Sequence, residues 1–331
     1  MSAVAESALL FMLAAVAFVL VGSATSAGLA RVVRPRAALW EPSVRHRVLV
    51  LLALSPALIA LALLFAASLP SLGALFVPSL DHCLAHDDGH AHLCFIHLPS
   101  GHMRLPAVAA MVFMGSYSLL RCVLACIGLQ RSARVLRTLA DMGTRYDLRN
   151  MTVIETTAPF CLAAGVLKPR VLISRGLLKS LDIRDQTIVL EHEHAHVQRR
   201  DALIAAVVRA FSSLQLPDVA RWIQRELEIA AEQACDERAA LAVDDRIAVA
   251  EAILSVEHML QSEASRELGI VALAFGESAV SRRVESLLRE PVAPLSLRPL
   301  GIAATFVLVG LVAVSENLHH VTESLLAALA R

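Results

Sequence analysis

Four long runs of apolar residues are the strongest feature in the hydrophobic pattern of the chain. They cover about residues 5–25, 48–69, 105–128 and 298–316, each with few or no charged side chains. An α-helix of about 20 apolar residues crosses the roughly 30 Å hydrocarbon core of a bilayer. The pattern therefore predicts four transmembrane helices.

The segment between the third and fourth runs, residues 130–297, alternates polar and apolar residues with a mostly helical period. Two short β-branched runs, residues 152–154 and 171–173, lie on either side of breaks at Pro159 and Gly165. Such runs favour strands. We expect a mainly helical domain that contains a small sheet.

Composition supports contact with lipid. Hydrophobic residues make up 56% of the chain and charged residues only 18%, which is more apolar than an ordinary soluble domain. The 30 basic and 30 acidic side chains balance, so no net basic surface indicates nucleic-acid binding. We expect membrane lipid as a partner and no direct binding of nucleic acid.

Arginines predict the orientation of the spans. No basic residue precedes the first run, which argues against a signal peptide. Two arginine clusters follow the first and third runs, namely Arg31, Arg34, Arg36, Arg45 and Arg47, then Arg131, Arg134 and Arg137. By the positive-inside rule, residues 130–297 are cytoplasmic, and both termini lie outside. The expected organisation is three spans with an external loop at 70–104 in residues 1–129, then the cytoplasmic domain, then the fourth span and a short external tail in 298–331.

A His-Glu-x-x-His motif carries the clearest chemistry. Residues four apart lie one turn apart on the same face of a helix, so the rings of His192 and His196 can converge on one ion. Zinc lowers the pKa of a bound water to about 7, and Glu193 is placed to take its proton. Asp201, nearby, is expected only to cap or to pair with neighbouring arginines. A charged helix can match this motif by chance, so the assignment needs a third ligand.

A second predicted helix, residues 225–238, offers that ligand. Glu228, Glu232 and Asp236 are spaced four apart and share one stripe. A catalytic zinc usually takes its third protein ligand from a following helix. Glu232 is the preferred ligand and Glu228 the alternative. The competing explanation of this stripe is an acidic helix face that is simply exposed to solvent and binds no metal.

These two motifs, ending in residues 199–201 and 234–236, resemble the BlaR/MecR family of integral-membrane zinc metallopeptidases. The resemblance includes the strand region at 158–174 and a basic helix at 281–288, and it covers about residues 105–317. It implies a mainly α membrane protein of the bacterial cytoplasmic (inner) membrane. Four transmembrane helices would carry a cytoplasmic α+β, zincin-like metallopeptidase domain between the third and fourth spans.

The resemblance also implies a function in transmembrane signalling. One catalytic zinc would be held by His192, His196 and Glu232, with Glu193 as general base and Asp236 orienting a zinc-binding histidine. The substrate would be a cytoplasmic protein, either a DNA-binding transcriptional repressor or the peptidase itself, and a homodimer is allowed for. The best-known members carry a penicillin-binding sensor domain after the fourth span. None is expected here, so the family's signalling role would need a different input.

The loop at 70–104 contains a second concentration of metal-binding residues. It holds six of the 13 histidines and two of the six cysteines. Imidazole and thiolate bind zinc or copper, so we expect an external Zn or Cu site that triggers the peptidase. A disulfide is the alternative explanation for the two cysteines. The candidate ligands are His82, Cys83, His86, His90, His92, Cys94 and His97.

Two other functions fit the same motifs. A quality-control protease of the HtpX type shares both zinc motifs, although such proteins usually begin with a basic cytoplasmic N-terminus. A non-catalytic, metal-responsive membrane receptor would hold a structural zinc. That receptor would need a fourth protein ligand in place of water, for which Glu228 is the nearby candidate.

Overall fold

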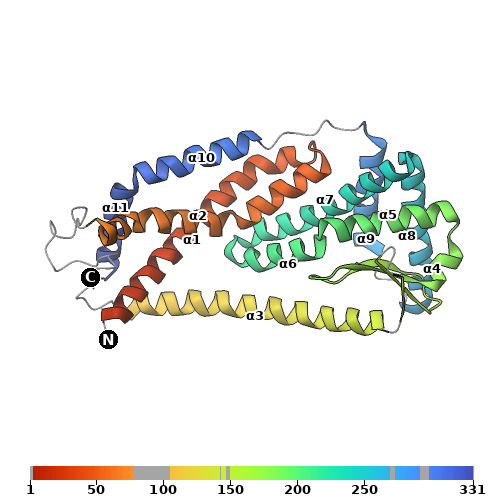
Figure 1. Cartoon of the computed structure of the whole chain (residues 1–331), viewed down its shortest axis with the longest axis horizontal. Coiled ribbons are helices and arrows are strands. Elements are labelled where there is room, and N and C mark those ends of the chain that lie inside the picture. The colour runs from red at the N-terminus through yellow and green to blue at the C-terminus, as the bar shows by residue number, and fades with distance from the viewer. Residues whose placement is uncertain are drawn as a thin grey trace.

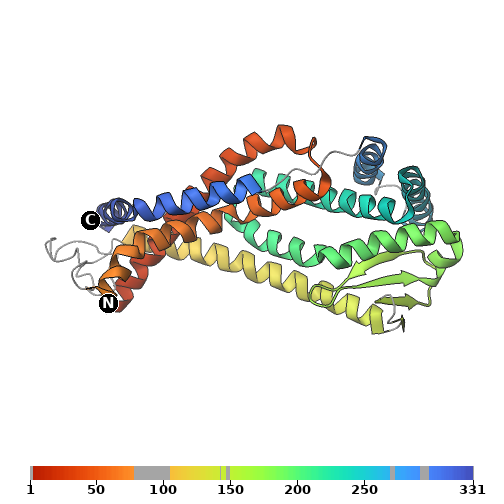
Figure 2. The same cartoon turned by 45° about the horizontal axis from the view of Figure 1, so that its top comes forward.

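The computed structural model is mostly helical and describes residues 3–77, 105–141, 143–146, 150–268, 273–290 and 298–330. Both termini lie at one end of the molecule, and the small sheet and α4 lie at the other (Figures 1 and 2). The helices are α1 (Ala3–Ala37), α2 (Pro42–Phe76), α3 (Leu105–Asp141), α4 (Arg175–Ser180), α5 (Ile183–Arg199), α6 (Asp201–Phe211), the 3₁₀ turn η4 (Ser212–Leu214), α7 (Pro217–Val243), α8 (Arg246–Leu268), α9 (Leu273–Leu288), α10 (Arg298–Ala313) and α11 (Ser315–Ala330). The strands are β1 (Thr144–Tyr146), β2 (Met151–Ile154), β3 (Cys161–Ala164) and β4 (Arg170–Ser174).

Two helices of the described chain are long and apolar enough to cross a membrane, namely Ser7–Ala37 of α1 and the whole of α2. Helices α10 and α11 pass the same test only as a pair that is bent by 67°. Helix α3 is continuous, but its apolar part, Gly115–Gly128, is shorter than a span. The membrane character is therefore shown, whereas the four-span arrangement stays a prediction.

Helix α2 is packed along much of its length. A Cβ atom on Gly22 of α1 would lie 2.6 Å from the carbonyl oxygen of Pro56, so a residue without a side chain is needed where the two helices cross. Further along α2, the buried His319 of α11 donates from Nδ1 to the carbonyl oxygen of Ala67 at 2.6 Å. Its Nε2 lies 3.0 Å from Oε1 of Glu323. The segment expected as a short tail thus forms a helix packed on α2.

The sheet has the strand order β1-β2-β4-β3. Its central strands β2 and β4, which the β-branched runs predicted, pair in parallel with Val153 opposite Ile173. Strands β1 and β3 pair antiparallel at the two edges. Val153 and Ile173 pack with Leu177 and Leu190, which joins the sheet to α5. This packing sets the edge strand β3 beside the helix that carries the His-Glu-x-x-His motif.

Candidate metal centre

Helix α5 has well-defined signals at both ends. At its start, the Asp182 carboxylate accepts a hydrogen bond from the backbone N–H of Asp185. It ends at Arg200, which adopts the left-handed conformation with φ 56° and ψ 40°. Helix α6 begins at the next residue. Because of this sharp turn, Asp201 folds back against the last turn of α5.

Three side chains converge where α5 faces α7. The Nε2 atoms of His192 and His196 are 3.2 Å apart, and the Glu232 carboxylate oxygens lie 3.5 Å from the first and 3.4 Å from the second. Two ligand atoms that are each about 2.0–2.1 Å from a tetrahedral zinc would be roughly 3.3 Å apart. Each ring nitrogen therefore has a carboxylate oxygen of Glu232 at a spacing suited to a shared zinc, and one ligand atom from each of the three residues lies within 4.8 Å of the others.

A carboxylate holds the other nitrogen of each ring. Nδ1 of His192 lies 2.9 Å from Oδ1 of Asp236, and Nδ1 of His196 lies 2.8 Å from Oδ2 of Asp201. With Nδ1–H donated to a carboxylate, Nε2 carries the lone pair that a metal needs. The resemblance had implied this role for Asp236. Sequence reasoning missed it for Asp201, although this residue directly follows the end of the motif helix.

Arginines support these carboxylates in turn. Arg283 of α9 donates to both oxygens of Asp236, at 2.6 and 2.8 Å, and its Nη1 lies 3.1 Å from Oε2 of Glu232. Arg199 donates from Nε to Asp201 at 3.1 Å. An arginine that donates two hydrogen bonds to one carboxylate balances its negative charge and fixes its orientation. Arg283 is a second site residue missed by motif reasoning, which had noted its segment only through the family resemblance.

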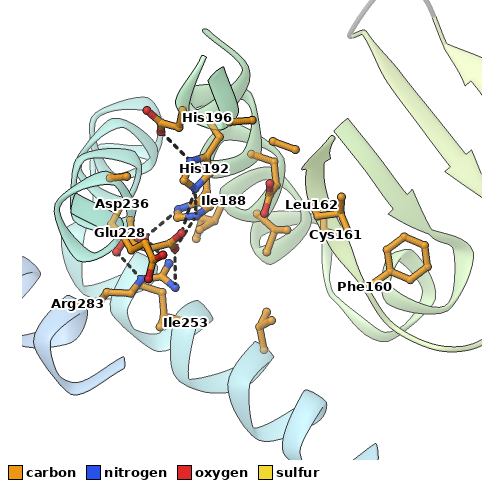
Figure 3. A pocket seen from close by; sticks show the side chains of 18 of the residues that line it. Phe160, Cys161, Leu162, Ile188, His192, His196, Glu228, Asp236, Ile253 and Arg283 are labelled. Atoms are coloured by element: carbon orange, nitrogen blue, oxygen red, sulfur yellow. Dashed lines mark hydrogen bonds and ion pairs between the residues drawn. The ribbon is translucent and has the colours of Figure 1, made fainter. Parts of the chain in front are cut away.

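The cluster opens into a cavity of about 540 Å³. In Figure 3, His192 and His196 lie one above the other on α5, with Asp236 on one side and Cys161 and Leu162 of β3 on the other. Apolar side chains of α8 form a further wall. The cavity therefore offers both a polar centre and an apolar surface to a bound chain.

Two glutamates that sequence analysis singled out also line the cavity. Glu193 lines it next to the histidines. Burial raises the pKa of the Cys161 thiol on β3, and the charge of Glu193 adds to that shift. Glu228 lines the cavity from an exposed position and is not part of the three-donor cluster. Among the described residues, the stripe on α7 thus contributes Glu232 to the cluster and Asp236 to its support. The candidate external ligands between His82 and His97 lie outside the described residues, and that second site stays a prediction.

Comparison with known proteins agrees with this geometry. A family model described as BlaR1 peptidase M56 matches residues 107–287, more than half of the chain. The chain belongs to the M56 peptidase family. No solved structure matches it. The resemblance to BlaR/MecR-type peptidases is therefore confirmed.

Family membership and structure together establish the coarse class of this M56 peptidase. It is a membrane protein with a metallopeptidase domain. A metalloprotease needs a metal ion, and the cluster of two imidazoles and one carboxylate provides suitable donors. The matched segment contains α5 and α7, the two helices that form this cluster.

Burial and hydrogen bonding act in opposite directions on the protonation of the M56 site. Burial lowers the pKa of both rings, but the carboxylates outweigh it. Asp236 and Glu232 raise the pKa of His192 to about 9. Asp201, Cys235 and Glu232 raise the pKa of His196 to about 12. The same histidines hold the pKa of Glu232 below its usual range despite its burial. Protons and a metal ion therefore compete for the two Nε2 positions.

We expect metal binding to release protons. The pKa values of the two rings are raised to about 9 and about 12, so at pH 7 protons compete with zinc, which requires neutral rings. Titration calorimetry with Zn²⁺ at pH 7, in two buffers of different ionisation enthalpy, should show that zinc binding releases protons. The affinity should rise as the pH approaches 9. A binding heat that does not depend on the buffer would contradict this expectation.

We also expect the two supporting aspartates to matter for affinity. Asp201→Asn and Asp236→Asn remove the negative charge opposite each ring and should weaken zinc by about 10–100-fold in a chelator competition. Glu232→Ala should release the metal. Glu228→Gln, which changes a cavity carboxylate outside the cluster, is the control and should bind zinc like the wild type. Wild-type affinity in Asp201→Asn would show that the His196 ring does not depend on this partner.

Proposed function

We propose that this chain is a zinc endopeptidase that cleaves a cytoplasmic protein in transmembrane signalling. The observation that carries the proposal is the convergence of His192, His196 and Glu232. Their ring nitrogens and carboxylate oxygens lie 3.2–3.5 Å apart beside a cavity that Glu193 also lines. These residues would hold the ion. Zinc, when bound, polarises the scissile carbonyl and acidifies a water.

The chain's own residues then perform the proton transfers. Glu193 takes the proton from the attacking water and passes it to the leaving nitrogen, as a general base and then a general acid. Asp201 and Asp236 keep the two imidazoles in the tautomer and orientation that present Nε2 to the cavity. Arg283 fixes Asp236 and Glu232 relative to each other. These contacts hold the site in place before a substrate binds, as a preorganised site requires.

The edge strand β3 provides a place for an extended substrate. The backbone N–H of Ser174 donates to the carbonyl oxygen of Phe160 at 2.9 Å, so this pair is a hydrogen-bonded pair of the β3–β4 ladder. Antiparallel ladders alternate, which turns the N–H and C=O groups of Cys161 and Ala163 away from β4. Both residues line the cavity. A peptide added to this edge would run past the metal centre.

Three donors favour a hydrolytic site over a structural one. A structural zinc usually has four protein ligands, and a catalytic zinc has three and an open position. Among the described residues, the cluster contains three donors, with Glu228 outside it. This supports a peptidase rather than a non-catalytic receptor.

The proposed substrate and the proposed orientation of the chain in the membrane are supported by observations other than the site geometry. A transcriptional repressor, or the peptidase itself, is proposed from the family resemblance. The cytoplasmic location of the domain, in a chain of four spans in the bacterial inner membrane, rests on the two arginine clusters. Metal sensing by the loop at 70–104 rests on its histidine and cysteine content alone.

Replacing the proposed base tests the function. Glu193→Gln removes the proton acceptor and leaves the three donors, so the purified protein should keep about one zinc but lose about 10²–10⁴-fold in cleavage rate. His192→Ala is the matched comparison and should lose both metal and cleavage. Casein in detergent solution, together with self-cleavage of the chain, supplies the readout. Unchanged cleavage by Glu193→Gln would end the enzymatic assignment.

A proline at the edge of β3 tests the mode of substrate binding. Ala163→Pro removes an N–H group that faces the open edge, where proline is tolerated, and loss of one backbone hydrogen bond should raise KM about 3- to 10-fold. Ala163→Gly keeps the N–H and is the control. Zinc content should stay unchanged in both variants. Equal KM values for the two variants would argue against strand addition at this edge.

A further inference from the structure

The end of α2 reaches the metal centre, although α2 is one of the two described helices suited to crossing a membrane. Arg45 and His46 lie in its second turn, and each is only 5% exposed. Arginine at the end of a membrane helix ordinarily extends toward water or lipid headgroups. The neighbouring Arg47 does so and is exposed. The burial of Arg45 and His46 therefore needs a different explanation.

His46 contacts the carboxylate that orients His196. Its Nε2 lies 3.7 Å from Oδ1 of Asp201, while the other oxygen of that carboxylate lies 2.8 Å from Nδ1 of His196. A separation of 3.7 Å is too long for a direct hydrogen bond, so the buried ring packs against the carboxylate. His46 also lines the cavity itself. One carboxylate thus separates α2 from a proposed metal ligand.

Arg45 contacts the opposite side of the same site. Its Nη2 donates to Oε1 of Gln233, whose Nε2 donates to the carbonyl oxygen of Arg282 at 2.7 Å. Gln233 follows the proposed ligand Glu232 along α7, and Arg282 precedes Arg283 along α9. Two consecutive residues of α2 therefore support both halves of the centre, through α6 on one side and through α7 and α9 on the other.

Apolar packing makes this connection stiff. Leu49, Leu52 and Ala53 of α2 share one buried cluster with Val208 of α6 and Ile223 of α7. A close-packed cluster of this kind resists sliding of one helix past another. The end of α2 is consequently held against the helices that carry the site. It also lies outside the segment matched by the family model, residues 107–287.

We propose that Arg45 and His46 are positioning residues for the metal centre, so that the membrane helix α2 is part of the scaffold of the active site. The inference rests on the proposed metallopeptidase function. His46 fixes the orientation of Asp201 by packing against it, and Arg45 fixes the α7 and α9 backbone around Glu232. A displacement of α2 would change both sides of the site together, which connects the membrane part of the chain to the chemistry.

Cobalt substitution in the full-length, detergent-solubilised protein tests this role. Co²⁺ in place of zinc gives visible absorption bands that report ligand geometry. His46→Ala and Arg45→Gln should shift these bands, weaken Co²⁺ by about 10-fold, and lower kcat for casein with little change in KM. Arg47→Gln, in the same turn of α2, should match the wild type in all four measurements.

Two further variants distinguish a loss of positioning from misfolding of the protein. His46→Gln and Arg45→Lys keep hydrogen-bonding capacity and should recover much of the Co²⁺ affinity if positioning is the role. In a double-mutant cycle, His46→Ala should add little to the loss caused by Asp201→Asn, because both act through one carboxylate. Additive losses in the cycle, or wild-type bands in His46→Ala and Arg45→Gln, would overturn the proposal. A wild-type protein that neither binds Co²⁺ nor cleaves casein would instead refute the metallopeptidase function on which it rests.

Discussion

The hydrogen bonds from Asp201 and Asp236 to the two histidine rings are the interactions on which the rest of the site depends. Both carboxylates are buried, at 9% and 1% exposure. A buried charge is tolerated only when it is paired and hydrogen-bonded. The histidines alone would leave part of each carboxylate unsatisfied, and Arg199 and Arg283 supply the remaining donors. The centre is therefore a network in which each member is held by at least one charged neighbour.

This network explains why so many helices meet at one point. Asp201 requires the left-handed turn at Arg200 that starts α6, and Asp236 requires the helix α9 that carries Arg283. Since α2 contacts Asp201 through His46, a candidate membrane helix is packed into the same arrangement. The three donors are thus held by contacts that extend as far as α2.

The sheet and α8 contribute the remainder of the cavity beside the metal cluster. Strand β3 has neither β-branched nor aromatic residues, and it is ordered by pairing with β4 and by packing against α5. Because it is an edge strand beside a polar centre, it gives an extended peptide backbone somewhere to bind. The apolar side chains of α8 on the cavity wall can accept a hydrophobic side chain of such a peptide.

The local sequence pattern was enough to predict those helices and strands whose sequence signals lie within a few helical turns of one another. The motif helix α5, the acidic stripe on α7, the strands β2 and β4, and the apolar length of α1 and α2 all follow from periodicity and composition. Only the tertiary structure shows that Glu232, and not Glu228, lies beside the two histidines, since both glutamates are on one stripe and their positions depend on how α7 packs against α5. It alone placed Asp201 against His196 and brought His46 from 155 residues earlier in the sequence to the same carboxylate. Such contacts depend on how segments that are far apart in the sequence pack together. The spacing of residues along the chain carries no information about that packing.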